Sequence, residues 1–422
     1  MAGYIEDRWL KKRPNKETGK RERTTLYGSN TKRYRVCGIP GVRRKSFETI
    51  DAAKRWKAKA EHETNTGDFL DPARGAMTLR TYIRTEYLPN RPSGDPGTAA
   101  TVRSRLDHVD TLLGDQRLAA LKAPELRGFI KDLEPRLGPA TTHEVWGYLS
   151  AVLQHAVDDE RIRKNPCKTK TVVLPVVPER RVQPWARDRI RLVRASLAPR
   201  YRATVDVGVG VGMRQGEVFG LAEGDIDDAA EVIHVRRQVK KLGAKLVFAL
   251  PKGQKTRTVP ASAHVRRRLR EHIAAFPPVE ITLPWGDSAP PQTERDTKER
   301  APQTYRLLFT TPSGTALRRD SWNLRQWKPA LAAAGVIPPP ETVRQGKRQR
   351  PVKKYAEARE DGFHVLRHTF ASVQLHARET IVAVSKWLGH KDPAITLRIY
   401  AHMMPEADGR GRAAMDDWFQ DL

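Results

Sequence analysis

The chain has 422 residues, 39% of them hydrophobic, which suggests about three domains of roughly 150 residues, each with a core of its own. It carries 77 lysine and arginine residues against 49 aspartate and glutamate residues, so the formal charge of +28 favours a polyanionic partner such as nucleic acid over a merely basic soluble protein. No apolar run is long enough for a membrane span, no signal-peptide pattern opens the chain, and Cys37 and Cys167 give no disulfide framework, so a cytoplasmic location is expected.

Residues 1–70 are predicted to form a small β-rich module that ends in a helix. Segments 33–37 and 43–47 flank a turn that contains Gly38 and Gly41, which indicates a hairpin, and Thr49 is a suitable N-cap for the helix. The first 60 residues contain 18 lysine and arginine residues but 6 aspartate and glutamate residues. A basic two-stranded ribbon can enter the major groove of DNA; the alternative is a short basic tail that is partly disordered.

Residues 75–170 are predicted to be helical, with helices near 78–83, 98–113, 124–134 and 141–161. The last is the clearest, because its apolar side chains recur at helical spacing and Pro166 follows its end. These side chains are Val145, Leu149, Val152, Leu153, Ala156 and Val157. Nothing in this region is typical of a catalytic site, so its polar faces would contribute phosphate contacts.

Residues 171–184 are predicted to be a linker, and residues 185–422 to be mostly helical with one small antiparallel sheet. Strands are expected at 232–235, 245–248 and 256–260, followed by a helix over 264–276. Segments 276–304 and 338–360 are rich in proline and charge and are predicted to be insertions or surface loops. The second could lie along DNA, although a solvated loop without a specific role is equally favoured.

Several polar residues in the last two hundred positions suit attack on a phosphodiester without a metal. Arg214 and Arg367 can hold the non-bridging oxygens of a phosphate with bidentate guanidinium groups. Tyr400 can act as the nucleophile and form a covalent intermediate. His364 and His390 can move protons or hydrogen-bond the charge that develops in the transition state.

In chain order these segments resemble the tyrosine recombinase, or phage integrase, family. The family's boxes appear as Gly212-Met213-Arg214-Gln215-Gly216-Glu217, a lysine-bearing hairpin, His364-Val365-Leu366-Arg367, Leu388-Gly389-His390 and Tyr400, with Val211 where the family usually has threonine. The resemblance covers roughly residues 184–402, with weaker support back to about residue 78. It implies an arm-type DNA-binding module over 1–70, a helical, SAM-like core-binding domain over 75–170, a linker over 171–184 and a catalytic domain over 185–422.

The resemblance also assigns roles to residues near these boxes. Lys252 is the expected donor of a proton to the leaving 5′-oxygen, with Lys255 as its rival, and Glu217 is expected to orient Arg214. His364 and Arg367 are three residues apart and would share a helix face, whereas His368 would point off that face and serve as a structural hydrogen-bonder.

Three further expectations concern the end of the chain. The two arginines are expected to lower the pKa of Tyr400 and so favour the phenolate. Gly389 is expected at a helix C-terminus, with His390 turning into the cleft. The tail after Tyr400 contains Trp418 and Phe419 and, by the resemblance, would pack on a neighbouring protomer.

The family implies site-specific recombination through a 3′-phosphotyrosyl link, without a cofactor or metal, which would integrate or excise a phage or another mobile element. The implied partners are double-stranded DNA at attachment sites and further copies of the chain, as a homotetramer on two duplexes. An excision factor or a host DNA-bending protein is a further possible partner. Two alternatives stay open: relaxation of DNA in the manner of a type IB topoisomerase, and a non-catalytic DNA-binding regulator on the same fold.

Overall fold

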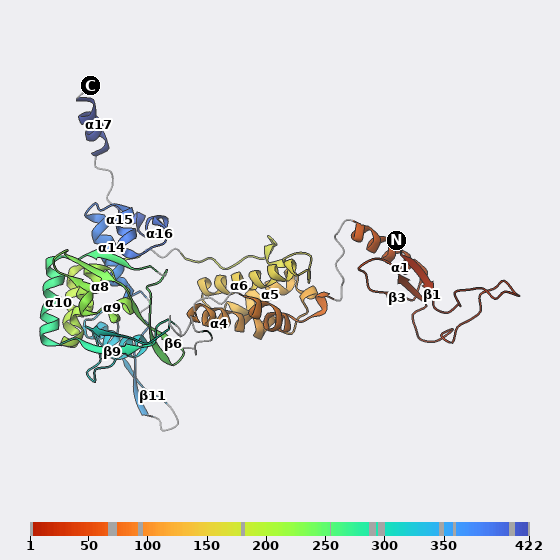
Figure 1. Ribbon diagram of the computed structural model, residues 1–422, viewed down its shortest axis with the longest axis horizontal. Helices are drawn as coiled ribbons and strands as arrows, with labels where there is room; N and C mark the ends of the chain where they lie inside the picture. Colours follow the sequence, from red (N-terminus) through yellow and green to blue (C-terminus); the bar gives the residue numbers. More distant parts are fainter. Residues whose placement is uncertain are drawn as a thin grey trace. The chain divides into compact units, whose positions relative to one another are not determined.

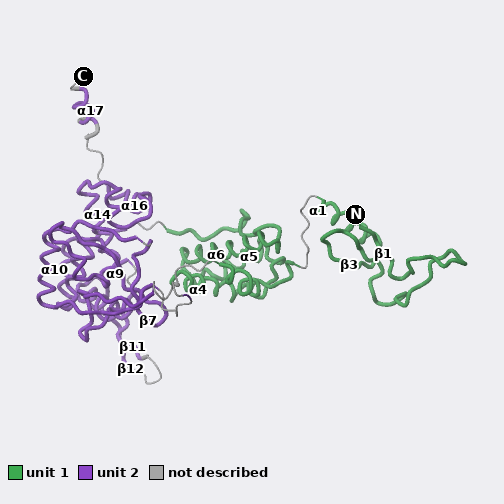
Figure 2. Tube along the Cα trace, in the orientation of Figure 1, with its two compact units in different colours: residues 1–178 green, residues 179–422 purple. Residues whose placement is uncertain are grey.

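The computed structural model describes residues 3–65, 74–91, 96–178, 182–253, 255–286, 293, 300–345, 350–357, 360–404 and 410–420. Its backbone contacts divide the chain into two compact units, residues 1–178 and 179–422, coloured separately in Figure 2. The predicted domain boundary near residues 70–75 falls largely outside the described residues. None of the helices in the described ranges combines the length and apolar character needed to cross a lipid bilayer.

The first part of unit 1 is a three-stranded antiparallel sheet with one helix. Strands β1 (Tyr4–Asp7), β2 (Tyr34–Cys37) and β3 (Lys45–Phe47) pair in the order β1-β2-β3, and helix α1 (Ile50–Asn65) packs against them (Figure 1). Val36, Ile39, Ala53 and Ala60 form the small core. The predicted hairpin and helix are therefore confirmed, and β1 adds a strand that the sequence pattern did not indicate.

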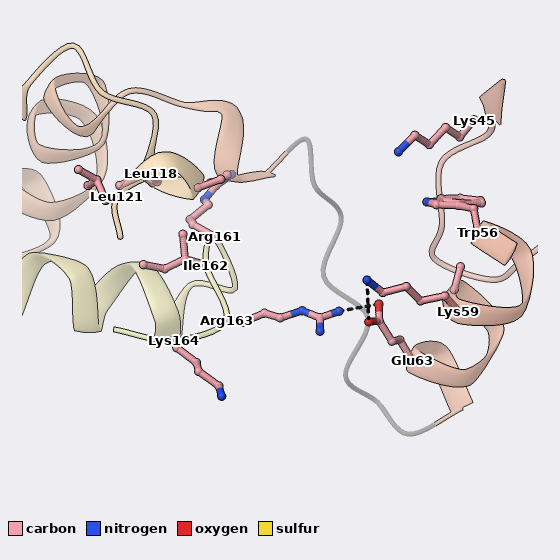
Figure 3. Close-up of a pocket in the computed structure, with 13 residues that line it drawn as sticks. Lys45, Trp56, Lys59, Glu63, Leu118, Leu121, Arg161, Ile162, Arg163 and Lys164 are labelled. Carbon is pink, nitrogen blue, oxygen red and sulfur yellow. Dashed lines mark ion pairs between the residues drawn. The ribbon is translucent and has the colours of Figure 1, made fainter. Parts of the chain in front are cut away.

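The second part of unit 1 is helical, as predicted. It contains the helices α2 (Leu79–Tyr82), α3 (Leu88–Asn90), α4 (Pro96–Leu113), α5 (Ala123–Leu133) and α6 (Pro139–Asp158), the π-helical turn η2 (Ile83–Tyr87) and the 3₁₀ turns η1 (Arg74–Ala76), η3 (Leu118–Ala120) and η4 (Pro166–Lys168). The predicted stripe on α6 is buried from Val145 to Ala156, and Val157 is partly buried against the same core. Beyond the end of α6, Arg161, Arg163 and Lys164 form a basic group, and Figure 3 labels all three.

Unit 2 is mostly helical with several small antiparallel sheets. Its helices are α7 (Arg187–Ser196), α8 (Arg202–Val211), α9 (Gln215–Phe219), α10 (Ala263–Ala275), α12 (Arg319–Trp322), α13 (Lys328–Ala333), α14 (His364–His376), α15 (Ile381–Leu388), α16 (Pro393–Tyr400) and α17 (Arg410–Gln420). Short turns η5 (Pro199–Tyr201), η6 (Glu223–Asp225), η7 (Asn323–Trp327, a π-helical turn) and η8 (Ala401–Met403) connect some of them. One hydrophobic core extends from Trp185 to Tyr400.

The predicted three-stranded sheet is wrong in one strand. Strands β4 (Ile226–Asp227), β5 (Val232–Val235) and β8 (Arg257–Pro260) form the sheet, in the order β4-β5-β8. The predicted middle strand instead belongs to a separate hairpin of β6 (Gln238–Leu242) and β7 (Lys245–Ala249). This hairpin packs on α9 instead of joining the three-stranded sheet. The packing is so close that a Cβ atom at Gly216 or Gly220 would lie within 3.0 Å of the β6 backbone.

Both segments predicted as loops contain paired strands. Strand β9 (Val279–Leu283) pairs with β10 (Gln303–Leu307), and β11 (Glu341–Gln345) pairs with β12 (Arg350–Lys354). Prolines at the strand borders concealed these hairpins, since proline-rich segments are typical of loops. The remaining parts of the two predicted insertions at 287–292, 294–299, 346–349 and 358–359 lie outside the described residues, as do linker residues 179–181.

Helices α8 and α14 approach closely at two glycines. A Cβ atom at Gly208 would lie 2.8 Å from the Leu366 side chain, and one at Gly212 would lie 2.4 Å from the ring of Phe370. Gly212 also ends α8 in the left-handed conformation, with φ of +65°. The two glycines therefore let the end of α8, and the box that follows it, rest directly on α14.

Replacement of Gly212 by alanine should destabilise the protein more than a matched replacement at Gly243. Both glycines have positive φ, but nothing lies within 4 Å of a Cβ atom at Gly243. Gly243→Ala should therefore cost about 1–2 kcal/mol for the left-handed conformation. Gly212→Ala should cost about 1–3 kcal/mol more, because Phe370 is buried and cannot move away. Urea unfolding followed by tryptophan fluorescence measures both; equal losses would contradict the close approach.

Candidate active site

Arg214 is held by a carboxylate that belongs to the first turn of the next helix. It occupies the N-cap position of α9, directly after the left-handed Gly212 and buried Met213. Glu217 accepts hydrogen bonds from the Arg214 backbone N–H at 2.8 Å and from its Nη1 at 3.0 Å. Glu217 is fully buried, whereas the Arg214 side chain is 20% exposed. The two hydrogen bonds to this buried carboxylate therefore fix the position of Arg214.

A third arginine, which sequence reasoning missed, shares the same carboxylate. Arg257 on β8 donates from Nη1 and Nη2 to the two Glu217 oxygens, at 3.0 Å and 2.6 Å, and from Nε to the Trp387 carbonyl oxygen at 2.6 Å. Burial raises the pKa of Glu217, but the bonds to Arg257 and the charges of Arg257, Arg214 and Arg367 outweigh it and bring the pKa to about 2. The signal was present in the Arg257-Thr258-Val259-Pro260 end of the lysine hairpin.

Arg367 projects from α14 into the protein interior and is 1% exposed. Its Nη1 donates to the Gly212 carbonyl oxygen at 2.8 Å and its Nη2 donates to the Leu388 carbonyl oxygen. Burial, followed by the charge of Arg214, lowers the pKa of Arg367 to about 9. Arg367 thus joins the ends of α8 and α15, where the Arg214 box and the Leu388-Gly389-His390 box begin.

His364 and His368 stand together at the start of α14. Their rings meet edge to face, with centroids 4.7 Å apart. Desolvation by the surrounding protein, the neighbouring His368 and Arg367 all lower the pKa of His364, although its ring remains open to solvent. An aromatic cluster fixes this end of the helix, because Phe363 packs against Trp322 and Trp327.

His390 turns off the end of α15 as predicted. Gly389 ends the helix with φ of +64°, and a Cβ atom there would lie 3.1 Å from Arg257 Cδ. The His390 Nδ1 atom lies 2.7 Å from the hydroxyl of Thr396, which is buried on α16. Burial, then the charges of Arg367 and Arg214, lowers the pKa of His390 to about 4.

Tyr400 ends α16 and is 1% exposed. Its hydroxyl oxygen lies 2.7 Å from His368 Nδ1. Because the ring of His368 also meets that of His364, the prediction that His368 points off the face shared by His364 and Arg367 is wrong. The expected lowering of the tyrosine pKa is also wrong for this structure. Burial raises the pKa of Tyr400 to about 12, because it outweighs the opposing charges of Arg367 and Arg214. The structure therefore holds Tyr400 as a protonated phenol.

In the described part of the chain, the two candidate lysines form no hydrogen bond or ion pair with this group. Lys252 and Lys255 lie exposed in the loop between β7 and β8, and neither forms a hydrogen bond or ion pair with the residues that the structure describes. The loop joins β8, which carries Arg257. The structure leaves the choice between Lys252 and Lys255 open, because both are exposed on the same loop and neither has a polar partner among the described residues.

The assembled residues suit the binding of a tetrahedral oxyanion such as phosphate. Arg367 donates to the carbonyl oxygens of Gly212 and Leu388, which come two residues before Arg214 and His390, so these boxes lie close together. Arg214, Arg257 and Arg367 bring three positive charges, and the only negative charge among their hydrogen-bond partners in the described ranges is Glu217. The net positive charge of this group would attract a phosphate and hold it next to a tyrosine hydroxyl.

Comparisons with known proteins agree with this arrangement. The sequence model of the phage integrase central domain matches residues 81–171. A tyrosine recombinase XerC-like protein of Caldanaerobacter subterraneus is 26% identical over 94% of this chain and 99% of its own length. The integrase of Mycobacterium phage D29 is 23% identical over 69% of this chain and 73% of its own length.

Solved structures show the same fold. A fragment of the Tn1549 transposon integrase, in complex with transposon right end DNA, superposes with a TM-score of 0.59 at 18% identity, over 81% of this chain and 99% of that one. A lambda integrase tetramer bound to a Holliday junction gives 0.52 at 15% identity, over 85% and 93%. The chain belongs to the tyrosine recombinase, or phage integrase, family. Members of this family break and rejoin DNA strands.

Family membership makes the support of Arg214 by Glu217 and Arg257 a testable property. Replacement of Arg257 by leucine would leave Glu217 buried with one fewer partner, which should destabilise the protein by about 3–5 kcal/mol. Arg306→Leu is the matched control, since Arg306 pairs with Glu223 at 2.9 Å with both side chains about half exposed, and it should cost less than about 1 kcal/mol. Urea unfolding compares the two variants; similar losses would show that the buried carboxylate does not depend on Arg257.

Proposed function

We propose that this protein is a site-specific DNA recombinase that integrates or excises a phage or another mobile element. Tyr400 attacks the scissile phosphate, forms a 3′-phosphotyrosyl link and releases a 5′-hydroxyl group. The hydroxyl of a partner strand then attacks that link and restores a phosphodiester. The observation that carries this proposal is the buried Tyr400 hydroxyl beside a histidine and within the field of Arg214 and Arg367.

The surrounding residues have distinct roles in this reaction. Arg214 and Arg367 bind the non-bridging oxygens and balance the charge of the pentavalent transition state. His364 and His390 hydrogen-bond the phosphate or move protons near it. Lys252, or its rival Lys255, protonates the leaving 5′-oxygen. The phosphotyrosine conserves the energy of the broken bond, so the reaction needs no nucleotide cofactor or metal.

The other parts of the chain supply DNA contacts in this proposal. Residues 1–70 act as an arm-type module, supported by their excess of basic residues. Residues 75–170 act as the core-binding domain, supported by the phage integrase central domain match, and residues 171–184 join it to the catalytic domain, residues 185–422. After α6, the exposed Lys164 offers a phosphate contact, whereas its neighbours Arg161 and Arg163 pair with Glu86 and Glu63 (Figure 3).

The working assembly in this proposal is a homotetramer on two duplexes at attachment sites within the bacterial cytoplasm. The lambda integrase tetramer on a Holliday junction supports it by analogy of fold. In this assembly helix α17 packs on a neighbouring protomer. Its apolar side chains Met415, Trp418 and Phe419 are available for this contact, because they are 51%, 70% and 61% exposed. An excision factor or a host bending protein would set the direction of the reaction.

The central test is covalent trapping on a nicked suicide substrate that carries the attachment site. The parent protein should form a covalent protein–DNA adduct, and Tyr400→Phe should form none while it binds the same DNA with similar affinity. Tyr355→Phe is the matched control and should form the adduct normally, because Tyr355 lies on the segment before α14. An adduct formed by Tyr400→Phe would show that another residue is the nucleophile.

The same substrate separates this function from its alternatives. A non-catalytic regulator would bind DNA but give no adduct with the parent protein. A type IB topoisomerase activity would relax a supercoiled plasmid but would not exchange strands between two attachment sites. Recombination between two sites, observed together with the adduct, is the outcome expected here.

A substrate with sulfur at the bridging 5′ position should identify the hairpin lysine. A thiolate leaves without protonation, so loss of the proton donor matters much less for this substrate. Lys252→Ala should cleave the oxygen substrate about 100-fold or more slowly than the parent and should recover on the sulfur substrate. Lys255→Ala serves as the comparison; if it alone shows the defect and the recovery, Lys255 is the donor.

A further inference from the structure

The hydroxyl of Tyr400 has one hydrogen-bond partner in the described part of the chain, and that partner is His368. The distance from His368 Nδ1 to the hydroxyl oxygen is 2.7 Å, and the ring centroids lie 5.7 Å apart. Tyr400 is buried, so its hydroxyl proton needs an acceptor within the protein. The Tyr400 hydroxyl can donate to Nδ1 of His368 when His368 is neutral and carries its proton on Nε2.

We propose that His368 is a catalytic residue that accepts the hydroxyl proton of Tyr400 as the tyrosine attacks the scissile phosphate. The bond from the Tyr400 oxygen to phosphorus forms, the bond from phosphorus to the 5′-oxygen breaks, and the tyrosine proton moves to His368 Nδ1. In the second half-reaction a 5′-hydroxyl attacks phosphorus and gives its proton to the hairpin lysine that protonated the leaving oxygen in the first. The bond from phosphorus to the tyrosine oxygen breaks, and His368 returns its proton to that oxygen. The inference rests on the proposed function, since it concerns the same nucleophile.

The geometry favours His368 over His364 for this step. His364 lies one helical turn earlier on α14, and its ring packs edge to face on His368 with centroids 4.7 Å apart. His364 makes no hydrogen bond to the Tyr400 hydroxyl. A base must lie within hydrogen-bond reach of the proton that it removes, and His368 alone of the two meets this condition. His364 remains free to serve the phosphate.

Burial, together with the charge of Arg367, keeps His368 neutral before DNA binds. The charged and titratable groups nearest to it are His364 and Arg367 on α14, Tyr400 on α16 and His390 after α15. Arg189 on α7 and Glu360 and Asp361 before α14 line the same cavity as His368. Burial, then Arg367, lowers the pKa of His368 to about 4. An incoming phosphate offsets the charge of Arg367 and so raises the pKa of His368, which favours proton transfer.

His368 is also reachable from solvent through a recess. Together with His364 it lines a cavity of about 770 Å³, whose wall includes Trp185, Arg189 and Asp361. Removal of the imidazole of His368 would therefore leave a space next to the Tyr400 hydroxyl that opens toward this cavity. A small base supplied in solution can occupy such a space, which makes chemical rescue a suitable test.

The first measurement is the rate of adduct formation in a single turnover, from pH 6 to pH 9, on the nicked suicide substrate. His368 enters the reaction neutral throughout this range, because its pKa before DNA binds is about 4, so the parent rate should be nearly constant. His368→Gln should be about 100-fold slower or more at pH 7, as expected for loss of a general base. Only the phenolate can then react, so its rate should rise about tenfold per pH unit toward the high pKa of Tyr400.

Two comparison variants make this result specific. His376→Gln changes a histidine two turns further along α14, where the side chain is exposed, and should behave as the parent. His364→Gln should slow the reaction but keep the flat pH dependence. Neither the His368→Gln defect nor its pH dependence should change on the 5′-sulfur substrate, because that substrate bypasses only protonation of the leaving group.

The second measurement is rescue of His368→Ala by imidazole. Imidazole should restore adduct formation in a concentration-dependent manner, whereas pyrrole, which has a ring of the same size without a basic nitrogen, should not. A His368→Gln variant with the parent's rate and flat pH profile would overturn the assignment, as would recovery on the sulfur substrate. Failure of the parent protein to form any adduct would instead contradict the proposed function.

Discussion

The buried carboxylate of Glu217 is the point on which the rest of this site depends. It accepts four hydrogen bonds from two arginines, Arg214 and Arg257, which come from different elements. A buried carboxylate is stable only when such partners surround it, and removal of one partner leaves an uncompensated charge. Glu217 therefore fixes Arg214 at the start of α9 and ties it to the strand β8.

Arg257 connects Glu217 to the end of helix α15. Its Nε donates to the Trp387 carbonyl oxygen, and its side chain lies so close to Gly389 that only glycine fits there without a shift. Arg367 makes the parallel connection between the Gly212 and Leu388 carbonyl oxygens. The ends of α8 and α15 are thus joined through guanidinium groups, which prearranges positive charge before any phosphate arrives. Preorganised charge of this kind needs little reorganisation during a reaction.

The tyrosine is held in a different way. Helix α16 buries it against α14, where desolvation keeps the phenol protonated despite two nearby arginines. The same burial keeps His368 neutral and within hydrogen-bond distance of the hydroxyl. The protonated nucleophile and its neutral proton acceptor therefore lie side by side. The charge of a bound phosphate raises the pKa of His368 and so favours transfer of the proton from Tyr400.

The sequence by itself determined the family, the order of the boxes and the helical character of residues 75–170. These properties depend on local patterns, such as the apolar stripe of α6 and the glycine before His390. It could not determine which strands pair, because the packing of β6 on α9 rests on contacts between distant glycines and backbone atoms. It also missed Arg257 and misjudged His368 and the pKa of Tyr400. Those properties depend on burial and on neighbours that are far apart in the chain. Burial and long-range neighbours are both set by the tertiary structure alone.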